Sequence, residues 1–580
     1  MVKIAVYTIA KDEEQFVERW YESAKDADYL LIADTGSTDR TVELAKQLGI
    51  NVIRISISPW RFDDARNAAL AAIPNDIDMC VSLDMDEIIT PGWRKEVEKA
   101  WKDGVTRPKY KHVWSWKPDG TPGLEFGYDH IHARKGYRWK HPVHEALYPY
   151  GMDEKLGWMD GLETHHHPDP TKSRSQYLPL LELSVREDPY NDRNAFYFAR
   201  ELYFYGQMDR AAQEFKRHLA LPTAQWGAER AAACRFLAKC DPANKEAHLK
   251  NSIAEDSGRR EAYVDLAMYY YEQKNWAECY LFAEKALSIK SKPLDYLCEE
   301  FAWGYLPHDL ASISSWNLGE KERALAHERD ALGFEPNDAR LRENFATMVR
   351  EIYPDKITAV IPTKSNVQGT LAVIDVLEAD PQVIEVVVVL DGDTAAKLYK
   401  EVLKPKSKVS SFKVDEGSGI HVMWNVGLEQ ARKLGTSAVL INDDLTPNTN
   451  SAGTLASILA SDSTLGLVCP TYEDRPFTTA VLEEAANARG AYDSTTGIAG
   501  CFMALSKDVV DKFNFDESMK WYYGDDDVVK WCNHEGYRTA ITSITSFEGN
   551  DSFTTVNDPP KNFEEDTARD REIYESKWMR

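Results

Sequence analysis

Paired carboxylates that follow apolar runs are the residues of this chain best suited to bind a cation. Asp84 and Asp86 end the run CVSLDMDE, and Asp443 and Asp444 end the run AVLINDDL about 360 residues later. Hard divalent cations such as Mn²⁺ or Mg²⁺ prefer carboxylate oxygens and keep positions open for phosphate groups. Each run therefore predicts a strand whose end holds a cation together with the phosphates that the cation carries.

The segments before each carboxylate pair follow the same order. VYTIAKDEE, LLIADTGSTDRTVELAKQLG and DDARNAAL precede the first pair, and AVIPTKSN, VVVVLDGD and GIHVMWNVGLEQA precede the second. Strand-like runs alternate there with helix-like segments of about 10 to 15 residues, which predicts βαβ units and a mostly parallel sheet. The chain thus contains two similar α/β modules. After Glu87 the sequence becomes rich in Trp, Tyr and His, and we expect an irregular region.

Between about Ser173 and Met348 the pattern predicts helices only. Ala199, Ala233 and Ala267 occupy equivalent places in three similar segments that are 34 residues apart, and a fourth copy follows an insertion containing LPHD. A period of this length with small residues at the packing points resembles tetratricopeptide repeats. A helical bundle without repeats is the alternative.

Composition narrows the class of protein. A chain of 580 residues exceeds what one core usually supports, so about two to four domains are expected. The net charge of −25 disfavours nucleic acid as a partner without excluding a local basic groove. An apolar run long enough for a membrane span or a signal peptide is missing, and the eight cysteines form no CxxC pair, so we expect a cytoplasmic protein with reduced thiols.

Four stretches of the N-terminal part, IAKDEE, ADTGSTDRTVELAKQLG, ARNAAL and LDMDE, resemble family 2 glycosyltransferases with a GT-A fold, in particular bacterial proteins in which this domain is fused to tetratricopeptide repeats. The C-terminal part resembles the same superfamily more loosely through VVLDGD, LINDDL, AGCFMALSKDVV and WYYGDDDVVKW. The resemblance implies an α/β fold class with two GT-A, Rossmann-like domains flanking an all-α tetratricopeptide-like solenoid. The expected domains are residues 1–170, 171–352 and 353–580.

The resemblance also implies a bifunctional, inverting glycosyltransferase that depends on Mn²⁺ or Mg²⁺. Its donor would be a nucleotide diphosphate sugar, a UDP-sugar first of all. Its acceptor would be a protein, a peptide or a glycan, and two active sites suggest two sequential additions.

In the first module, the resemblance assigns a role to each candidate site residue. The nucleotide-sugar contacts are Thr8, Asp34, Arg66 and Asp84. The metal ligands are Asp86, His165 and His167, the last two from the run ETHHHPDP, which is a solvated loop in the alternative interpretation. The general base is Glu145, in KHPVHEAL, with His144 as its neighbour.

In the second module, the nucleotide-sugar contacts implied by the resemblance are Thr363, Asp391, Asn425 and Asp443, and the metal ligand is Asp444. Asp525 is the candidate base, with Asp527 as its companion. Adjacent carboxylates raise one another's pKa, which suits a proton acceptor that works near neutral pH. The histidine that the family carries downstream is missing from SFEGNDSF, which implies either a substitute ligand from this string or weaker metal binding by this module.

Three other functions stay open at this point. The repeats alone could be the working part of a binding or scaffold protein with one or both α/β modules inactive. A transferase that modifies nucleobases in DNA is a further alternative, disfavoured by the charge. A hydrolase with two carboxylates ranks lower, because it has no need for strand ends of the nucleotide-binding type.

Overall fold

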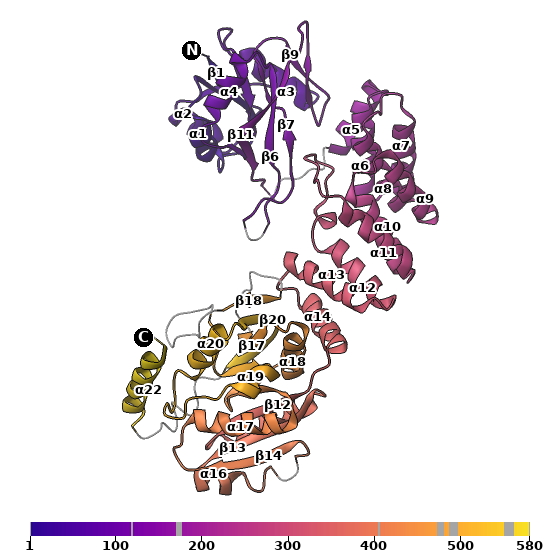
Figure 1. Ribbon diagram of the computed structural model, residues 1–580. Helices are drawn as coiled ribbons and strands as arrows, with labels where there is room; N and C mark the ends of the chain where they lie inside the picture. Colours follow the sequence, from indigo (N-terminus) through magenta and orange to yellow (C-terminus); the bar gives the residue numbers. More distant parts are fainter. Residues whose placement is uncertain are drawn as a thin grey trace. The chain divides into compact units, whose positions relative to one another are not determined.

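The computed structural model describes residues 2–117, 120–169, 177–403, 406–472, 481–485, 497–549 and 562–578. The chain divides into two compact units, Met1–Trp303 and Gly304–Arg580 (Figure 1). The first unit contains an α/β region followed by helices, and the second contains helices followed by an α/β region. The border between the units thus falls inside the helical part of the chain. The three domains expected from the sequence stay a prediction.

The N-terminal α/β region is built on a five-stranded sheet with the order β3-β2-β1-β4-β8. Strands β1 to β4 run parallel, and β8 is antiparallel to β4. The predicted alternation of strands and helices is confirmed here. The elements are β1 (Ile4–Ala10), α1 (Val17–Ala24), β2 (Tyr29–Asp34), α2 (Thr41–Gln47), β3 (Asn51–Arg54), α3 (Phe62–Ala72), β4 (Met79–Ser82) and β8 (Ile131–Ala133).

The expectation of an irregular region after Glu87 is wrong. This segment forms a second sheet with the order β5-β11-β6-β7, a two-stranded sheet of β9 and β10, and one helix. Its aromatic residues alternate with polar ones along the strands, so that Tyr110 and His112 of β6 are buried while Lys109 is exposed. The elements are β5 (Glu87–Ile89), α4 (Trp93–Lys102), β6 (Arg107–Val113), β7 (Glu125–Tyr128), β9 (Tyr137–Lys140), β10 (Ala146–Pro149) and β11 (Leu156–His166).

The rest of the first unit consists of paired helices. Ala199, Ala233 and Ala267 lie on α6, α8 and α10 and are fully buried, as the 34-residue period predicts. Each of these helices packs against the helix that follows it. The elements are α5 (Tyr177–Glu187), α6 (Asp192–Phe204), α7 (Met208–Ala220), α8 (Gly227–Cys240), η1 (Pro242–Asn244), α9 (Lys245–Glu255), α10 (Arg260–Glu272), α11 (Trp276–Ser288) and η2 (Glu300–Ala302).

The second unit begins with three helices and continues into a mixed sheet with the order β14-β13-β12-β15-β19-β17-β20-β16. Its helical elements are α12 (Leu306–Asn317), α13 (Lys321–Phe334), α14 (Ala339–Ile352), α15 (Val367–Ala379), α16 (Gly392–Tyr399), α17 (Ile420–Leu434), α18 (Ser451–Ser461), α19 (Lys507–Lys512), α20 (Gly524–His534) and α22 (Phe563–Trp578). Its strands are β12 (Ile357–Thr363), β13 (Val383–Asp391), β14 (Val409–Val414), β15 (Ser437–Ile441), β16 (Leu445–Pro447), β17 (Leu465–Tyr472), β18 (Leu482–Glu484), β19 (Phe502–Leu505) and β20 (Arg538–Gly549).

The two sheets share their first five positions. In the second unit, β14, β13, β12 and β15 run parallel, and β19 is antiparallel to β15. This is the order and direction of β3, β2, β1, β4 and β8 in the first unit. The similarity of the two α/β modules seen in the sequence therefore extends to strand order.

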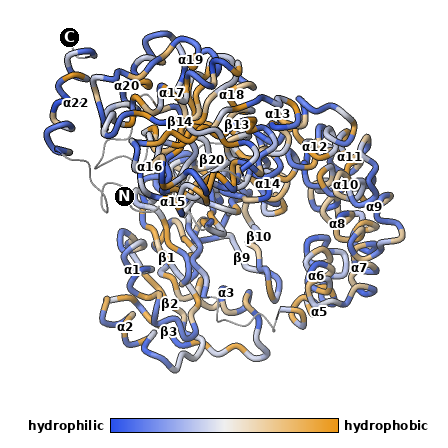
Figure 2. Tube along the Cα trace, turned by 90° about the horizontal axis from the view of Figure 1, so that it is seen from below, coloured by the Kyte–Doolittle hydropathy of each residue, from blue (hydrophilic) through white to orange (hydrophobic). Residues whose placement is uncertain are grey.

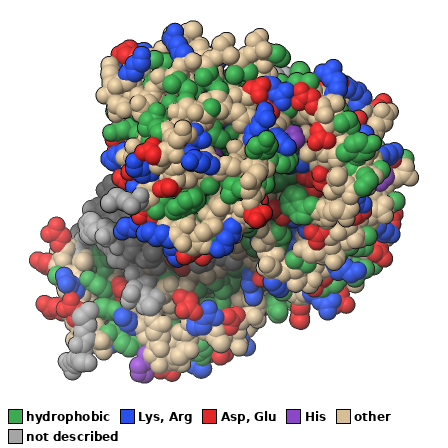
Figure 3. All heavy atoms as spheres, turned by 90° about the horizontal axis from the view of Figure 1, so that it is seen from above, with side chains coloured by type: hydrophobic (Ala, Val, Ile, Leu, Met, Phe, Trp, Pro, Cys, Tyr) green, Lys and Arg blue, Asp and Glu red, His purple; other side chains and the backbone are tan. Residues whose placement is uncertain are grey.

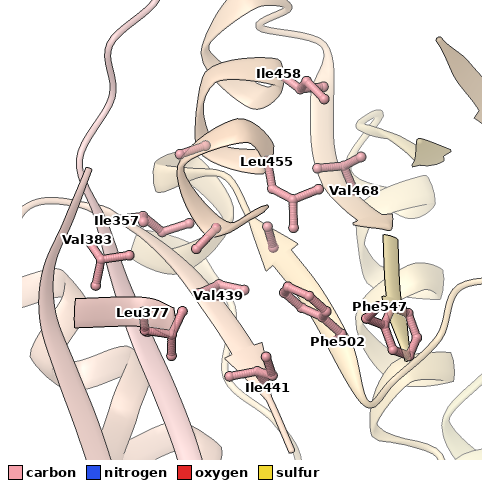
Figure 4. Close-up of a cluster of buried hydrophobic side chains, with 14 of the residues drawn as sticks. Ile357, Leu377, Val383, Val439, Ile441, Leu455, Ile458, Val468, Phe502 and Phe547 are labelled. Atoms are coloured by element: carbon pink, nitrogen blue, oxygen red, sulfur yellow. The ribbon is translucent and has the colours of Figure 1, made fainter. Parts of the chain in front are cut away.

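Apolar side chains on the strands form the core of each α/β region. In the second unit, Val439, Leu455 and Phe502 are fully buried where helix α18 packs over the sheet (Figure 4). Hydrophobic residues follow strands such as β1, whereas α22 is mostly hydrophilic (Figure 2). On the face shown in Figure 3, Lys and Arg side chains are interspersed among Asp and Glu side chains. In the described part of the chain, every helix is too short or too polar to cross a membrane.

Candidate active site

The candidate residues of the first module gather where the parallel strands end. Asp34 is the last residue of β2 and pairs in register with Ala10, the last residue of β1. Asp84 follows the end of β4, which lies on the other side of β1. Because the carboxyl ends of parallel strands meet at one edge of the sheet, these side chains share one site. Thr8 lies within β1 and is fully buried.

Arg66 is the buried cation of this site. It projects from α3, where its side chain is only 6% exposed, and its Nη1 lies 2.8 Å from Oδ1 of Asp84. It also donates to the hydroxyl of Ser82 and to Glu145. Burial opposes the ionisation of Asp84, but the Arg66 guanidinium outweighs it and lowers the pKa of this carboxyl. Asp84 is therefore a fixed anion, oriented by a partner that is always charged.

Glu145 and His144 lie between the site and the helical repeats. Glu145 is ion-paired with Arg66, so the candidate base belongs to the same cluster as Asp84. The ring of His144 stacks on Tyr197 of α6, with centroids 4.2 Å apart, and its carbonyl accepts a hydrogen bond from Arg193. His144 thus joins the α/β region to the repeats, while Glu145 anchors Arg66.

Asp34 has one oxygen that is suited to a ligand. Its side chain is fully buried, and its Oδ1 accepts a hydrogen bond from the amide of Ser37. Its Oδ2 accepts no hydrogen bond from the described residues and lies 3.6 Å from Nε of Arg54, which is mostly exposed. A buried carboxylate oxygen without a donor is costly, and an N–H of a nucleotide base would supply the missing donor.

Asp86 is paired with the middle residue of the histidine run. Nε2 of His166 lies 3.4 Å from Oδ2 of Asp86. Nδ1 of His166 donates to the carbonyl of Trp114, so in the neutral ring the lone pair is on Nε2, which faces Asp86. A second hydrogen bond of this kind is typical of metal-binding histidines. His166 was missed by the sequence analysis.

The two histidines chosen from the sequence have other neighbours. Nε2 of His165 donates to Glu163, and the ring contacts Trp116 edge-on. The ring of His167 stacks on Trp116, and its backbone amide donates to the carbonyl of Asp86. The roles of His165 and His167 as metal ligands stay a prediction, but the imidazole in contact with the Asp86 carboxylate is that of His166.

A second residue missed by the sequence analysis is Glu87. It is buried, and its carboxyl accepts a hydrogen bond from the amide of Asp84. Burial, together with the charges of Asp84 and Asp86, raises the pKa of Glu87 well above its usual value. Glu87 is thus a buried carboxyl that favours its neutral form, and its hydrogen bond from the Asp84 amide fixes the backbone turn that carries Asp84 and Asp86. The acidic string LDMDE gives no hint that its last member is buried.

Asp86 and His166 fit a divalent cation. Asp86 offers a carboxylate oxygen and His166 offers an imidazole nitrogen as ligand atoms. The Asp86 carboxylate is 32% exposed, and the two side chains are already close. Mn²⁺ and Mg²⁺ often use one or two protein ligands and complete their coordination with substrate phosphates and water. The arrangement therefore suits a cation that arrives with a diphosphate.

In the second module, Asp443 takes the place of Asp84 but has neutral partners. It follows β15, is buried, and accepts a hydrogen bond of 2.5 Å from the hydroxyl of Thr363. Thr363 is also bonded to the hydroxyl of Tyr399. Burial raises the pKa of Asp443 to about 7 against these hydrogen bonds. Asp444, the predicted metal ligand, is the next residue and is partly exposed.

Asp391 and Asn425 are both bonded to protein backbone. Oδ1 of Asp391, at the end of β13, accepts a hydrogen bond of 2.7 Å from the amide of Gly417. The amide group of Asn425, on α17, donates to the carbonyl of Phe515 and accepts from the amide of the same residue. Asn425 therefore holds the backbone around Phe515, and its contact to a nucleotide sugar stays a prediction.

The acidic run at the start of α20 separates into two roles. Burial and the neighbouring charge of Asp526 raise the pKa of Asp525 to about 7, which suits a proton acceptor. Asp527 is fully buried and is ion-paired with Lys577, at 2.7 Å, while its Oδ1 accepts a hydrogen bond from the indole of Trp578. Asp527 thus holds the end of α22. Its predicted part in catalysis is untested.

Comparison with family models finds a match in the N-terminal part of the chain. Residues 5–130 match the family model described as glycosyl transferase family 2. A tetratricopeptide repeat-containing protein of Synechococcus elongatus is 33% identical over 96 residues, which are 16% of this chain and 23% of that protein. An uncharacterized glycosyltransferase of Rickettsia typhi is 33% identical over 100 residues, which are 17% of this chain and 32% of that protein. The chain therefore matches about a quarter to a third of the length of these relatives.

Among solved structures, residues 1–349 of S. aureus TarS align with 33% of this chain and 59% of that chain, at 16% identity and a TM-score of 0.27. MamA aligns with 28% of this chain and 89% of its own, at 17% identity and a TM-score of 0.23. The family match supports a glycosyltransferase domain of family 2 in residues 5–130.

Proposed function

We propose that the first α/β region transfers a sugar from a nucleotide diphosphate sugar, a UDP-sugar first of all, to a hydroxyl or amide of an acceptor. The main observation behind this proposal is the cluster at the strand ends. There Arg66 fixes the anion Asp84 beside the pair of Asp86 and His166. This arrangement offers separate positions for the ribose of the nucleotide, for a cation bound to its diphosphate and for a general base. The match of residues 5–130 to glycosyl transferase family 2 supports it.

In this proposal each residue has a limited task. Oδ2 of Asp34 accepts a hydrogen bond from an N–H of the nucleotide base. Asp84 accepts hydrogen bonds from hydroxyl groups of the ribose. Asp86 and His166 would hold Mn²⁺ or Mg²⁺, and such a cation would neutralise the charge on the leaving diphosphate. Glu145 keeps its predicted role as general base, in competition with its ion pair to Arg66.

The proposed reaction is a single displacement. The acceptor atom forms a bond to the anomeric carbon while the bond from that carbon to the diphosphate oxygen breaks on the opposite face, and the acceptor proton passes to the base. The anomeric configuration therefore inverts. NMR of the product checks this step, and retention of configuration would contradict it.

We extend the proposal to the second α/β region, because its first five strands have the same order and its carboxylates follow the same strand. The chain would then add two sugars in sequence. A protein, peptide or glycan acceptor suits the helical repeats, since a helical solenoid presents an extended concave surface.

The proposal is tested by donor hydrolysis with the full-length protein, Mn²⁺ and a panel of UDP-, GDP- and dTDP-sugars. Asp86→Asn removes one candidate cation ligand, and we expect nucleotide release to fall by about a hundredfold or more. Asp76→Asn is the matched control, because this exposed aspartate is paired with Lys3 just before the start of β1, away from the strand ends that carry the site. Asp444→Asn reports on the second region separately.

Unchanged hydrolysis by Asp86→Asn would contradict the metal site. If no donor were hydrolysed and none raised the melting temperature, a binding protein with inactive α/β regions would be the better description. Glu145→Gln separates two roles of this residue: the amide can still accept from Arg66, so a positioning role survives the change and a base role does not.

A further inference from the structure

The helices that open the second unit carry a cluster of ligand-type side chains that includes none of the candidate active-site residues. His308, on α12, and His327 and Asp330, on α13, bring one ligand atom each to within 4.8 Å of one another. We propose that these three residues bind a zinc-class divalent cation that ties α12 to α13. This inference is independent of the transferase activity proposed above.

The spacing of the three residues suits a shared ligand. His327 and Asp330 are three residues apart on α13, so their side chains lie on the same face of that helix. His308 lies in the first turns of α12, which packs against α13. Residues from two facing helices therefore converge on one point, as in the metal sites of helical bundles.

One pair of ligand atoms has the spacing of a tetrahedral site, and all three atoms lie within 4.8 Å of one another. Nδ1 of His308 lies 3.5 Å from Oδ2 of Asp330. Ligands at about 2.0–2.1 Å from a tetrahedral zinc ion are separated by about 3.4 Å, so this pair already has the required spacing. The rings of His308 and His327 have centroids 6.0 Å apart, so both imidazoles lie beside the same point.

The helices that hold these residues are fixed by other contacts. The hydroxyl of Ser312 on α12 donates to the carbonyl of Ala324 on α13, at 2.9 Å. Asp309, next to His308, accepts two hydrogen bonds from Arg340 of α14. The backbone positions of the cluster are therefore set by other bonds, and a cation would find its ligands partly arranged.

The donor set selects the kind of cation. Two imidazoles and one carboxylate suit Zn²⁺ and other late divalent ions better than Mg²⁺ or Ca²⁺, which prefer all-oxygen sites. His308 is 17% exposed and Asp330 is 60% exposed, so the cluster is open to solvent on the carboxylate side. A fourth position is left for water or for a group of a bound ligand. Asp330 lies in the last turns of α13, where the helix dipole favours a cation.

The test is calorimetric titration of the chelator-treated, full-length protein with ZnCl₂. We expect His327→Ala and Asp330→Asn each to lower zinc affinity at this site by about tenfold or more, because changes outside the ligand set already cost this much. His248→Ala is the matched control. His248 forms a pair with Asp241, at 3.1 Å, and among the described residues no third histidine, cysteine or carboxylate joins this pair to form a cation cluster.

His166→Ala is titrated in parallel, so that zinc bound at the candidate active site is counted separately. Donor hydrolysis by His327→Ala should equal that of the wild type, which separates this inference from the proposed function. Asp330→Asn changes an exposed side chain and keeps the helix intact, so it answers the question even if His327→Ala unfolds.

Cobalt gives a second measurement. Co²⁺ bound by two imidazoles and a carboxylate in tetrahedral geometry shows visible absorption, which should vanish in His308→Ala and persist in His248→Ala. Zinc titrations of His308→Ala and His327→Ala that match the wild type would overturn the proposal. The cluster would then be an imidazole–carboxylate ion pair only.

Discussion

The first carboxylate after the fourth parallel strand has opposite surroundings in the two α/β regions. Asp84 is bound by the buried guanidinium of Arg66, whereas Asp443 is bound by the hydroxyl of Thr363. Burial opposes ionisation in both cases. Arg66 outweighs it and lowers the pKa of Asp84, while the pKa of Asp443 is raised to about 7.

The difference comes from one position on the preceding helix. The ARN string of α3 places Arg66 just before Asn67, and the corresponding string MWN of α17 places Trp424 before Asn425. The two asparagines make the same pair of backbone hydrogen bonds, Asn67 to Trp139 and Asn425 to Phe515. The two regions therefore share the backbone contacts of the asparagine, but among the described residues only the first has a buried arginine beside its carboxylate. A strand end of the same design can thus hold a permanent anion or a carboxyl that titrates near neutral pH.

The largest effect is expected from the cation itself. Arg66→Met leaves Asp84 and Glu145 without their buried partner, and breaking such a pair costs roughly 3–5 kcal/mol. Urea unfolding followed by hydrogen exchange of peptides that contain β4 measures the loss. Arg54→Met is the control, because Arg54 is mostly exposed and its distance to Asp34 is 3.6 Å. A loss below about 1 kcal/mol for Arg66→Met would mean that the cluster is not stabilised by this cation.

The second prediction concerns pH. An aspartate in an unfolded chain has a pKa of about 3.9. The folded second unit holds a proton on Asp443 up to a pKa of about 7, so folding takes up a proton between these values and stability falls as pH rises through them. The effect of one such group is a few kcal/mol at most. Asp525, whose pKa is also raised to about 7, acts in the same direction.

Asp443→Asn should therefore reduce, without abolishing, the decrease in stability of the second unit between about pH 4 and 7. Asp84 has a lowered pKa, so its contribution is present at neutral pH and is lost as the pH falls through the folded value. Asp84→Asn should therefore lower stability mainly at neutral pH, and its difference from the wild type should shrink as the pH falls through the folded pKa of Asp84. Denaturant unfolding across this pH range, with exchange of peptides containing β4 and β15, separates the two. Equal pH profiles for both wild-type regions would refute the contrast.

Much of the fold was predictable, because the spacing of apolar residues and the residue types at strand ends are local features of the sequence. The alternation of apolar runs with amphipathic segments predicted β1 to β4 and β12, β13 and β15 but not β14, and the 34-residue spacing placed Ala199, Ala233 and Ala267 at buried positions. The carboxylates at strand ends were also found from the sequence, since a buried run followed by acidic residues is a local signal.

The histidine that meets Asp86 was not predictable, because it depends on strand register. Strand β11 follows β6 in register up to Met159 and resumes at Glu163, so an irregular stretch separates the two paired segments. Alternation beyond that stretch places His166 toward Asp86, and a count along the sequence does not reveal where the pairing shifts. Long-range partners were hidden for the same reason: the bond from Arg66 to Glu145 spans 79 residues.

The smallest expected loss of stability concerns a feature that the two α/β regions share, the asparagine before the strand that ends in carboxylates. Asn67→Ala and Asn425→Ala each remove one donor and one acceptor that hold a distant backbone segment, at Trp139 and Phe515. Both asparagines are partly exposed, so each loss should be about 1–3 kcal/mol. Unfolding with exchange of peptides that contain β9 and residues 513–517 measures both. Asn425 also donates to the Glu517 carboxylate, at 3.0 Å, and Glu517→Gln measures how much of the stability loss comes from that hydrogen bond. If the stability losses of Asn67→Ala and Asn425→Ala differ by much more than this amount, the two asparagines do not have the same structural role. The similarity of the two regions would then be limited to strand order.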